Sequence, residues 1–379
     1  MNSAPIKSFA KRFASLPDPR RQRTQRHQLL DILAIAILGT LCGADNWVDI
    51  ADFGRTKEDW LRQFLELPNG IPSHDTFGRV FARLDPEAFR ACFLDFVHDV
   101  RDLTQDRIIA IDGKTLRGSH NHLSGQKPIH MVSAWAAVNH LVLGQVKVDD
   151  KSNEITAIPQ LLRLLDISGC VVTLDAMGCQ KEIAQQITQQ GGDYVLALKG
   201  NQGRMAEMVC DIFRYAESDN YAQVGEQGAY KTVNKGHGRI ETRQCWVLSD
   251  PKHLEYLQTV AYWPRLTSIV KVTSERRIGD TASCETRYYL TSLPGDARRL
   301  LQAVRKHWSI ENELHWVLDI AFLEDKNRTY KDHAPENLAI LRQLALNLLA
   351  QEKTAKCGTK GKRLQAGWDN DYLLKVISI

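Results

Sequence analysis

The spacing of apolar residues divides the chain into a helical first part and a mixed second part. In the first hundred residues apolar side chains recur every three or four positions, which is the spacing of one helix face. Helices are predicted from Leu29, around Trp60, from Ser73, whose hydroxyl is placed to cap its helix, and from Pro86. We therefore expect an all-helical N-terminal domain over residues 1–103.

After Arg107 the apolar runs become short and rich in β-branched residues, which is typical of buried strands. The pattern predicts strands at residues 108–111, 131–138, 141–148, 171–174 and 194–198, and helices at 153–165 and 180–188. Residues 200–293 contain alternating stretches that predict a β-rich insertion, and Asp296 is placed to cap a helix after it. This order predicts an α/β fold over residues 104–379, a ribonuclease-H-like mixed sheet with flanking helices.

Three carboxylates stand where a buried strand or helix normally has an apolar residue. Asp112 and Asp175 each end an apolar strand run, and Glu311 lies on the apolar side of the final helix. Carboxylates that converge on one interior place repel one another unless a divalent cation neutralises them. Oxygen ligands suit Mg²⁺, and a pair of such ions supports phosphoryl transfer. We therefore predict a catalytic two-ion Mg²⁺ site, which Mn²⁺ can also fill, with Asp112 shared by both ions.

Other interpretations of the same residues stay open. An aspartate at a strand end often belongs to a turn or caps a helix, and a glutamate can lie at the rim of an apolar face. His307, Glu311 and His315 are spaced four residues apart on one helix face, so they are able to hold zinc or iron. Glu313 is a second choice for the third acid, although it points about 200° away from Glu311 around an α-helix.

Basic residues at the start of the chain point to a nucleic-acid partner. The chain carries a net charge of +4, but its first 30 residues carry +6, so the remainder is slightly acidic. A basic arm on a near-neutral body suits contact with the phosphate backbone of DNA, and the alternative is a solvated tail. The arginines expected to make this contact are Arg20, Arg21, Arg23 and Arg26.

The helix that begins at Ser73 offers a second basic surface, with Arg79 and Arg83 opposite its apolar face. A helix, a short turn and a basic helix form a helix-turn-helix DNA reader, although helix pairs of this kind occur in any bundle. Lys114 and Lys199 each follow a predicted strand near the proposed acid site. There they can meet phosphates or remain exposed loop lysines.

The composition narrows the class of protein. With 43% hydrophobic and 25% charged residues, the chain has the balance of a soluble globular protein. Its most apolar run, Leu29 to Ala44, is short and contains Asp31, which disfavours a membrane span and predicts a cytoplasmic protein. The eight cysteines form no C-x-x-C pair, which argues against zinc ribbons and redox motifs. The phosphate-binding loop and the nucleophile elbow are both missing.

Six segments together give the chain a resemblance to a known family. They are Asp112–Ser119, Lys151–Ile155, Thr173–Gln180, Tyr194–Gln202, His307–Asn312 and Phe322–Asp325. In these segments the chain resembles the H-repeat-associated group of bacterial insertion-sequence transposases, which belong to the DDE superfamily. The match extends over nearly the whole chain, including the helical N-terminal part.

The resemblance implies a fold, an activity and a set of partners. It implies a ribonuclease-H-like catalytic domain in which Asp112, Asp175 and Glu311 bind Mg²⁺. It also implies an enzyme that binds the terminal inverted repeats of its own element in double-stranded DNA, cuts there, and joins the freed 3′ ends to target DNA. Because two DNA ends must be held together, it further implies a homo-oligomer on DNA, in the cytoplasm at the nucleoid.

The chain departs from the pattern of many related transposases around the last acid. Those enzymes carry Y-x2-R-x3-E-x6-K, whereas this chain has Val304, His307 and Leu318 in place of the Tyr, Arg and Lys. His307 is therefore the expected phosphate donor beside Glu311. Members of the group also lie beside Rhs elements as immobile copies. Two further hypotheses remain: a DNA-binding protein that no longer mobilises DNA, and a stand-alone metal-dependent nuclease.

Overall fold

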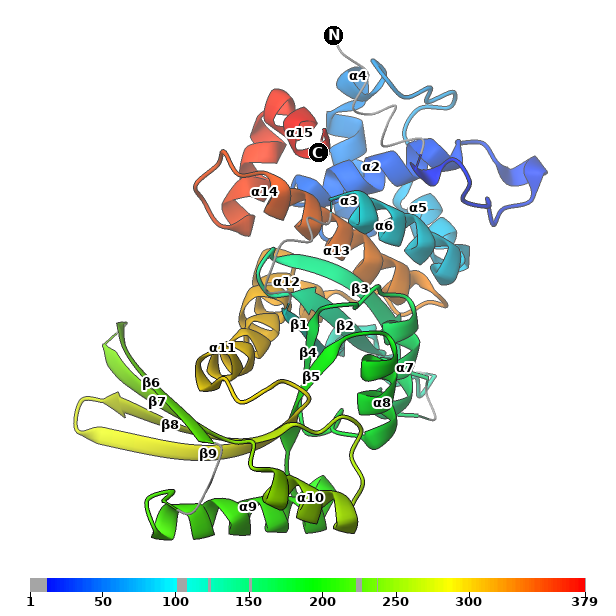
Figure 1. Cartoon of the computed structure of the whole chain (residues 1–379). Coiled ribbons are helices and arrows are strands. Elements are labelled where there is room, and N and C mark those ends of the chain that lie inside the picture. Colours follow the sequence, from blue (N-terminus) through cyan, green and yellow to red (C-terminus); the bar gives the residue numbers. More distant parts are fainter. Residues whose placement is uncertain are drawn as a thin grey trace.

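The computed structural model describes residues 12–100, 108–121, 124–149, 152–222, 227–236 and 238–378, and the elements below lie within them. Their centre is a mixed sheet of nine strands in the order β3-β2-β1-β4-β5-β9-β8-β7-β6 (Figure 1). The strands are β1 (Ile108–Thr115), β2 (His130–Ala136), β3 (Leu141–Lys147), β4 (Val171–Leu174), β5 (Asp193–Leu198), β6 (Gln227–Gly236), β7 (Arg239–Leu248), β8 (Ser268–Ile278) and β9 (Thr281–Thr291). Helices pack on both faces of this sheet, so the fold is mixed α/β.

The first five strands bring β1 and β4 side by side. β1 runs parallel to β4 with Ile111 opposite Leu174, and β4 in turn runs parallel to β5. β2 and β3 are antiparallel to their neighbours. Residues that follow a matched pair in parallel strands lie next to each other. Asp112 and Asp175, which directly follow Ile111 and Leu174, are therefore brought to one place in the sheet.

The two faces of the sheet have separate apolar cores. The helices that cover them are α7 (Glu154–Arg163), α8 (Lys181–Gln189) and α11 (Ala297–His307). α7 and α8 pack on one face and α11 on the other, where it crosses β1, β4 and β5 (Figure 1). Val172 and Leu196 point into the larger core, whereas Val171 and Val195 point into the smaller core under α11. This alternation explains why β4 and β5 consist of continuous apolar runs.

The insertion after β5 extends the same sheet. β9 pairs antiparallel with β5, and the hairpins β6–β7 and β8–β9 continue as long strands that project from the body (Figure 1). Besides these four strands, the insertion contains α9 (Gly203–Ser218) and α10 (Pro251–Val260), which the sequence pattern did not predict. α9 buries Met205, Val209 and Ile212 at helical spacing, but polar residues between them hide this pattern.

All described elements before β1 are helices. They are η1 (Gln22–Thr24), α2 (Leu29–Leu41), α3 (Trp47–Thr56), α4 (Glu58–Leu61), α5 (His74–Arg83) and α6 (Pro86–Val100). Ser73 caps α5 as predicted, because its hydroxyl accepts a hydrogen bond from the Thr76 amide at 3.3 Å. The helix predicted around Trp60 is only the one-turn α4. The longer α3 before it was not predicted, and it begins where Asn46 accepts a hydrogen bond from the Val48 amide.

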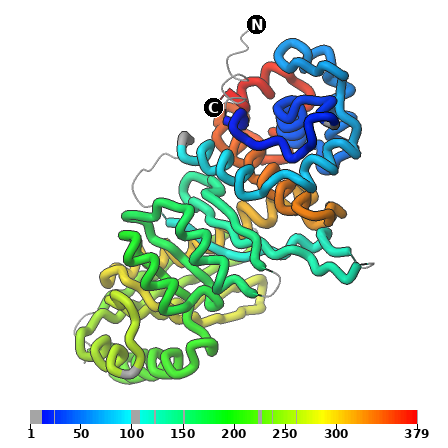
Figure 2. Tube along the Cα trace, turned by 90° about the vertical axis from the view of Figure 1, so that its right-hand side faces the viewer, coloured from blue at the N-terminus to red at the C-terminus, as the bar shows by residue number. Residues whose placement is uncertain are grey.

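Helices at the other end of the chain complete this helical body. They are α13 (Ala334–Gln351), α14 (Thr359–Trp368) and α15 (Asn370–Ile377). α13 is buried along most of its length, because it packs against α2, α5 and α6 and also against β3. Arg363 of α14 donates hydrogen bonds to the Thr40 carbonyl and to Asp45, just after α2. Figure 2 shows the first and last helices side by side, so residues from both sides of the predicted boundary near residue 103 share one packing unit.

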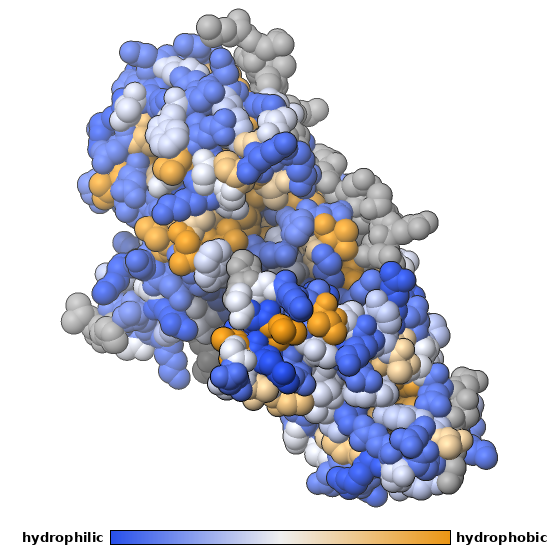
Figure 3. All heavy atoms as spheres, turned by 90° about the vertical axis from the view of Figure 1, so that its left-hand side faces the viewer, coloured by the Kyte–Doolittle hydropathy of each residue, from blue (hydrophilic) through white to orange (hydrophobic). Residues whose placement is uncertain are grey.

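The face of the molecule shown in Figure 3 is mostly hydrophilic. On the face shown in Figure 3, apolar residues gather where the helical body meets the sheet. Within the described parts of the chain, no helix combines the length and the apolar character that crossing a bilayer requires. All eight cysteines are free thiols.

Candidate active site

Asp112 and Asp175 meet where β1 and β4 lie side by side. Asp112 lies inside β1 and not at its end as predicted, because pairing with β2 continues as far as Thr115. Asp175 directly follows β4, and its Oδ1 atom accepts hydrogen bonds from the amides of Met177 at 2.9 Å and Gly178 at 3.2 Å. Asp175 therefore stabilises a turn, which was its alternative role, and it also lines the cavity described below.

Glu311 lines the same cavity from the helical region between β9 and α13. The sequence predicts one continuous α-helix there, but the chain forms α11, then the π-helical segment η4 (Ile310–His315), then α12 (Trp316–Ala321). Ile310 and Leu314 are buried and hold η4 against the core, while Glu311 is exposed near its start. π-helical turns are rare and occur frequently at functional sites.

One cavity of about 280 Å³ is lined by all three predicted acids. Asp112 comes from β1, Asp175 from the turn after β4, and Glu311 from η4. Lys199, an exposed residue after β5, and His307, at the end of α11, line the same cavity. The structure thus brings together five of the predicted site residues, which come from five places in the chain.

The cavity concentrates negative charge around Asp112, whose side chain is only 20% exposed. Burial is the largest cause of a raised pKa here, and the carboxylates of Glu154, Asp175 and Glu311 add to it, so that the pKa of Asp112 rises to about 7. Like charges nearby disfavour the ionised form of a carboxyl group. Of the three carboxylates, Glu154 has the largest effect.

Glu154 was not among the predicted site residues. It lies in the first turn of α7, and its Oε1 atom is 2.6 Å from Nε2 of His130 on β2. A side chain at Gly113 would collide with both Glu154 and His130, so a glycine directly after Asp112 lets this pair pack on β1. Glu154 does occur in one of the segments that carry the family resemblance. Only the packing of α7 against the sheet reveals that it lies near Asp112.

The acid site fits a divalent cation in charge and in ligand type. Carboxylate oxygens suit Mg²⁺ and Mn²⁺, and an ion would neutralise the charge of Asp112, whose pKa is raised first by burial and then by the neighbouring carboxylates. Among the described residues, no three His, Cys, Asp or Glu side chains stand close enough together to hold a metal ion. Binding an ion would therefore draw the carboxylates closer than they stand in this structure.

The two histidines on either side of Glu311 are neutral at pH 7. Burial lowers the pKa of His307 to about 4 and that of His315 to about 3. Nδ1 of His307 is 3.0 Å from the Thr173 hydroxyl, and Nδ1 of His315 is 3.6 Å from Oδ2 of Asp112. In the alternative zinc or iron site these two histidines and Glu311 would share one ion, but here the two rings face different partners, and among the described residues no three such side chains stand close enough together to hold a metal ion.

Glu313, the second choice for the third acid, has a different partner. Its Oε2 atom is 2.7 Å from Nδ1 of His140, in the turn between β2 and β3. It is not among the residues that line the acid cavity. Of the two glutamates, Glu311 is therefore the one that shares a cavity with the aspartates.

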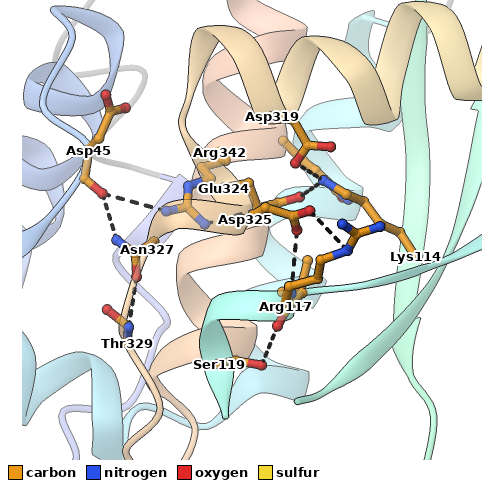
Figure 4. Close-up of polar contacts among 12 residues, drawn as sticks. Asp45, Lys114, Arg117, Ser119, Asp319, Glu324, Asp325, Asn327, Thr329 and Arg342 are labelled. Atoms are coloured by element: carbon orange, nitrogen blue, oxygen red, sulfur yellow. Dashed lines mark hydrogen bonds and ion pairs between the residues drawn. The ribbon is translucent and has the colours of Figure 1, made fainter.

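Lys114 lies two residues after Asp112 but belongs to a different group of charges. Its Nζ atom donates to Asp319 at 2.5 Å and to Glu324 at 2.7 Å, and its side chain is only 11% exposed (Figure 4). Glu324 lies in the short helix η5 (Glu324–Lys326) and also faces Arg342 of α13 at 3.7 Å. This arrangement favours a structural role for Lys114 over the predicted phosphate contact.

The predicted DNA-binding arginines differ in their exposure. Arg20 is nearly buried, because it pairs with Asp18 at 2.7 Å and donates to the His27 carbonyl. This favours a structural role for Arg20. The side chains at the surface are those of Arg21, Arg23, Arg26, Arg79 and Arg83.

Comparison with known proteins identifies the family. Two family models match the chain: DDE_Tnp_1-associated over residues 10–97, and the transposase DDE domain over residues 103–348. The H repeat-associated protein YhhI of Escherichia coli (strain K12) is 39% identical over 377 residues, which are 98% of each chain. YbfD of the same strain, also H repeat-associated, is 42% identical over 249 residues, which are 66% of this chain and 97% of YbfD. A structure of the piggyBac transposase synaptic complex with hairpin DNA aligns with a TM-score of 0.39 and 10% identity, over 98% of this chain and 78% of that one.

The two family models divide the chain as its elements do. The first covers the helices before β1, and the second covers β1 to β9 and most of α13. The match to YhhI spans both parts. The chain therefore belongs to the H-repeat-associated group of DDE transposases.

Proposed function

We propose that the chain binds the terminal inverted repeats of an insertion sequence, cuts DNA there in a reaction that depends on a divalent metal ion, and joins the freed ends to target DNA. The observation that carries this proposal is the convergence of Asp112, Asp175 and Glu311 on one cavity. The match to the transposase DDE domain supports DNA cleavage and transfer as the class of reaction. The order of β1 to β5 with α7 and α8 supports a ribonuclease-H-like catalytic domain.

In this proposal Asp112, Asp175 and Glu311 hold Mg²⁺, or Mn²⁺ in its place. When bound, such ions activate the attacking oxygen and neutralise charge at the reacting phosphate. Lys199 lines the same cavity, and in this proposal its ammonium group contacts a neighbouring phosphate oxygen. His307 is neutral at pH 7, so it orients a group through one ring N–H and supplies no positive charge.

DNA binding is assigned to exposed cations outside the cavity. Arg21, Arg23 and Arg26 lie in the N-terminal arm, and Arg79 and Arg83 lie on α5. Contacts of this kind position a duplex and fix its register. Because both ends of an element must be held at once, the active form in this proposal is a homo-oligomer assembled on DNA.

The test is strand cleavage and joining on a labelled duplex that carries the inverted-repeat end, with Mg²⁺ or with EDTA. We expect cleavage only with Mg²⁺, and a loss of roughly a thousandfold or more in Asp112→Asn, Asp175→Asn and Glu311→Gln. Binding of the same duplex in EDTA should stay within about twofold, because these acids lie apart from the proposed DNA-binding cations. Loss of binding in these variants would contradict the division of roles.

Two outcomes would favour the other hypotheses. Specific binding without any cleavage by the native chain would identify an immobile copy that retains DNA recognition. Metal-dependent cleavage without preference for the repeat end, and without joining, would identify a stand-alone nuclease.

A further inference from the structure

A second, open cavity lies between the helical body and the segment that leads into α13. It measures about 660 Å³, and we call it the helix–loop groove. One wall comes from α3 and α5 and the other from residues 327–331. Its lining includes Trp47, His74, Arg79, Arg328, Tyr330 and Lys331. The groove therefore joins residues from the two sequence regions that the two family models match separately.

The helix–loop groove carries an excess of positive charge. Arg79, Arg328 and Lys331 line it with permanent cations, whereas Asp75 is its one carboxylate. Arg79 is 64% exposed: its Nε donates to the Asp75 carbonyl at 3.2 Å and one terminal nitrogen lies 3.5 Å from the Asp75 carboxylate, while the rest of the side chain is at the surface. Arg328 and Lys331 are exposed, and neither makes an ion pair with a described residue. Such a surface attracts a polyanion.

The loop wall of the groove is held in place by polar contacts. Asn327 donates to the Asp45 carbonyl at 2.8 Å and accepts from the Thr329 amide at 2.9 Å (Figure 4). Gln126, from the loop between β1 and β2, donates to the Tyr330 carbonyl at 3.0 Å. These bonds fix the backbone on both sides of Arg328. A preformed wall of this kind binds a ligand without the entropy cost of ordering a free loop.

The helix wall is also rigid. Trp47 at the start of α3 stacks on Phe81 of α5, with ring centroids 4.8 Å apart. A Cβ atom added at Gly78 of α5 would meet the same indole at 3.4 Å, so this helix packs directly against Trp47. Arg79 is the next residue, so its position relative to the loop wall is set by packed aromatic rings and not by a flexible segment.

We propose that the helix–loop groove binds the sugar-phosphate backbone of double-stranded DNA, with Arg79 on one wall and Arg328 and Lys331 on the other. Three separated cations along an open groove suit the repeated charges of a phosphate backbone better than a single small anion. Arginine also matches a phosphate with two parallel hydrogen bonds. This inference rests on the proposed DNA-binding function. It adds that residues 327–331, from the region matched by the transposase DDE domain, supply part of the binding surface.

The polar network of Figure 4 connects the groove to the strand that carries Asp112. Asn327 follows η5, and Glu324 of η5 pairs with Lys114 of β1 at 2.7 Å. Lys114 is two residues from Asp112 on the same strand. DNA held at Arg328 would therefore be fixed relative to the acid site through packed elements, which suits an enzyme that must cut at a set distance from the place it binds.

The experiment measures the affinity of the full chain for a labelled DNA duplex in EDTA over a range of salt concentrations. The test variant is Arg328→Ala/Lys331→Ala. The control is Arg163→Ala/Lys252→Ala, which removes the same charges from exposed positions on α7 and α10. We expect the test variant to bind the duplex about tenfold or more weakly. The slope of log affinity against log salt concentration should become less steep by about 2, while the control keeps the native affinity and slope. Melting temperatures of all variants should match the native chain, since these side chains are exposed.

The possible results separate the inference from the function on which it rests. If the native chain binds the duplex and the test variant binds it equally well with an unchanged salt slope, the inference is wrong and the proposed function stands. If the test variant binds DNA normally but no longer binds a polyglutamate peptide that the native chain binds, the groove takes an acidic protein segment instead. Failure of the native chain to bind any duplex would overturn both.

Discussion

Two clusters of charged side chains are centred only two residues apart on β1, at Asp112 and Lys114, and they are built in opposite ways. Burial is the largest cause that raises the pKa of Asp112 to about 7, and the neighbouring charges that raise it further are carboxylates. Around Lys114, the neighbours within ion-pair distance are Asp319 and Glu324, which are opposite in sign to the ammonium group. Arg342 adds a second cation beside Glu324. The charges around Asp112 are therefore unbalanced in sign, whereas those around Lys114 are balanced, although similar residue types form both clusters.

The comparison shows how a structural group of charges differs from a functional one. A buried charge is tolerated when an opposite charge and hydrogen bonds replace the water that it loses. The cluster at Lys114 meets this condition and joins β1 to η5 and α13 (Figure 4). The cluster at Asp112 does not meet it, and groups with strongly shifted pKa values in a cavity are typical of active sites. Charge balance, and not the number of acids, therefore marks the candidate site.

The pH dependence of stability should expose the unbalanced cluster most strongly. The pKa of Asp112 is about 7 in the folded chain, against an ordinary value of 3.8. Between these values the folded chain holds a proton that the unfolded chain releases, so the stability from this group falls as pH rises and is fully lost above 7. We therefore expect the free energy of unfolding in EDTA, measured relative to Asp112→Asn, to fall by about 3 kcal/mol between roughly pH 5 and pH 8.

Asp112→Asn is the control for this measurement, because it removes the titrating carboxyl group but keeps His307 and His315, whose lowered pKa values make stability rise with pH over the same range. Urea titrations of both proteins at the two pH values measure the difference directly. Addition of Mg²⁺ at the higher pH should stabilise the native chain and leave the variant unchanged, since only the native cluster has charge to neutralise. The same pH dependence in both proteins would show that the pKa of Asp112 is not raised in the folded chain.

The sequence predicts well those parts of the site that depend on local pattern. β4 and β5 are recognisable as apolar runs, so Asp175 and Lys199 could be placed directly after strands. Asp296 caps α11 as expected, because capping depends only on neighbouring residues. Pairing of β1 with β4 then brings Asp112 and Asp175 together. Short-range signals and the order of the strands are enough for these features.

The features that the sequence did not predict depend on contacts between distant residues. Asp319 and Glu324, the partners of Lys114, are 205 and 210 residues away, so Lys114 resembles any lysine after a strand. Glu154 approaches Asp112 only because α7 packs on the sheet. The π-helical turn at Glu311 has the same apolar spacing, Ile310 and Leu314, as an α-helix. In each case tertiary packing decides among structures that the local pattern allows equally.

A smaller effect on stability is expected from the balanced cluster when one partner is removed. Lys114→Met keeps the apolar stem but leaves the buried carboxylate of Glu324 with only Arg342 nearby at 3.7 Å. Loss of one partner of a buried pair typically destabilises a protein by several kcal/mol, and the remaining arginine should limit the loss here to about 2–3 kcal/mol. Urea titration measures this change.

Lys199→Met is the matched control for Lys114→Met, because Lys199 also follows a strand but is exposed. Its free energy of unfolding should stay within about 0.5 kcal/mol of the native value. The structural role of the Lys114 cluster, and with it the contrast with the acid cluster, would be wrong if Lys114→Met were as stable as the native chain but lost affinity for DNA. That result would restore the predicted phosphate contact of Lys114.

The smallest effect on stability is expected from Glu313→Gln. This variant tests whether Glu311 and Glu313, the two glutamates of η4, have different roles because they have different neighbours. Glu313 and His140 are 41% and 48% exposed, so their ion pair is screened by water, and Glu313→Gln should cost no more than about 0.5 kcal/mol. Cleavage of the inverted-repeat duplex should remain near the native rate, whereas Glu311→Gln should lose it, because only Glu311 lines the cavity with Asp112 and Asp175. The two variants remove one negative charge each from positions two residues apart. A loss of cleavage in Glu313→Gln with normal activity in Glu311→Gln would mean that η4 turns by two positions when DNA and metal bind.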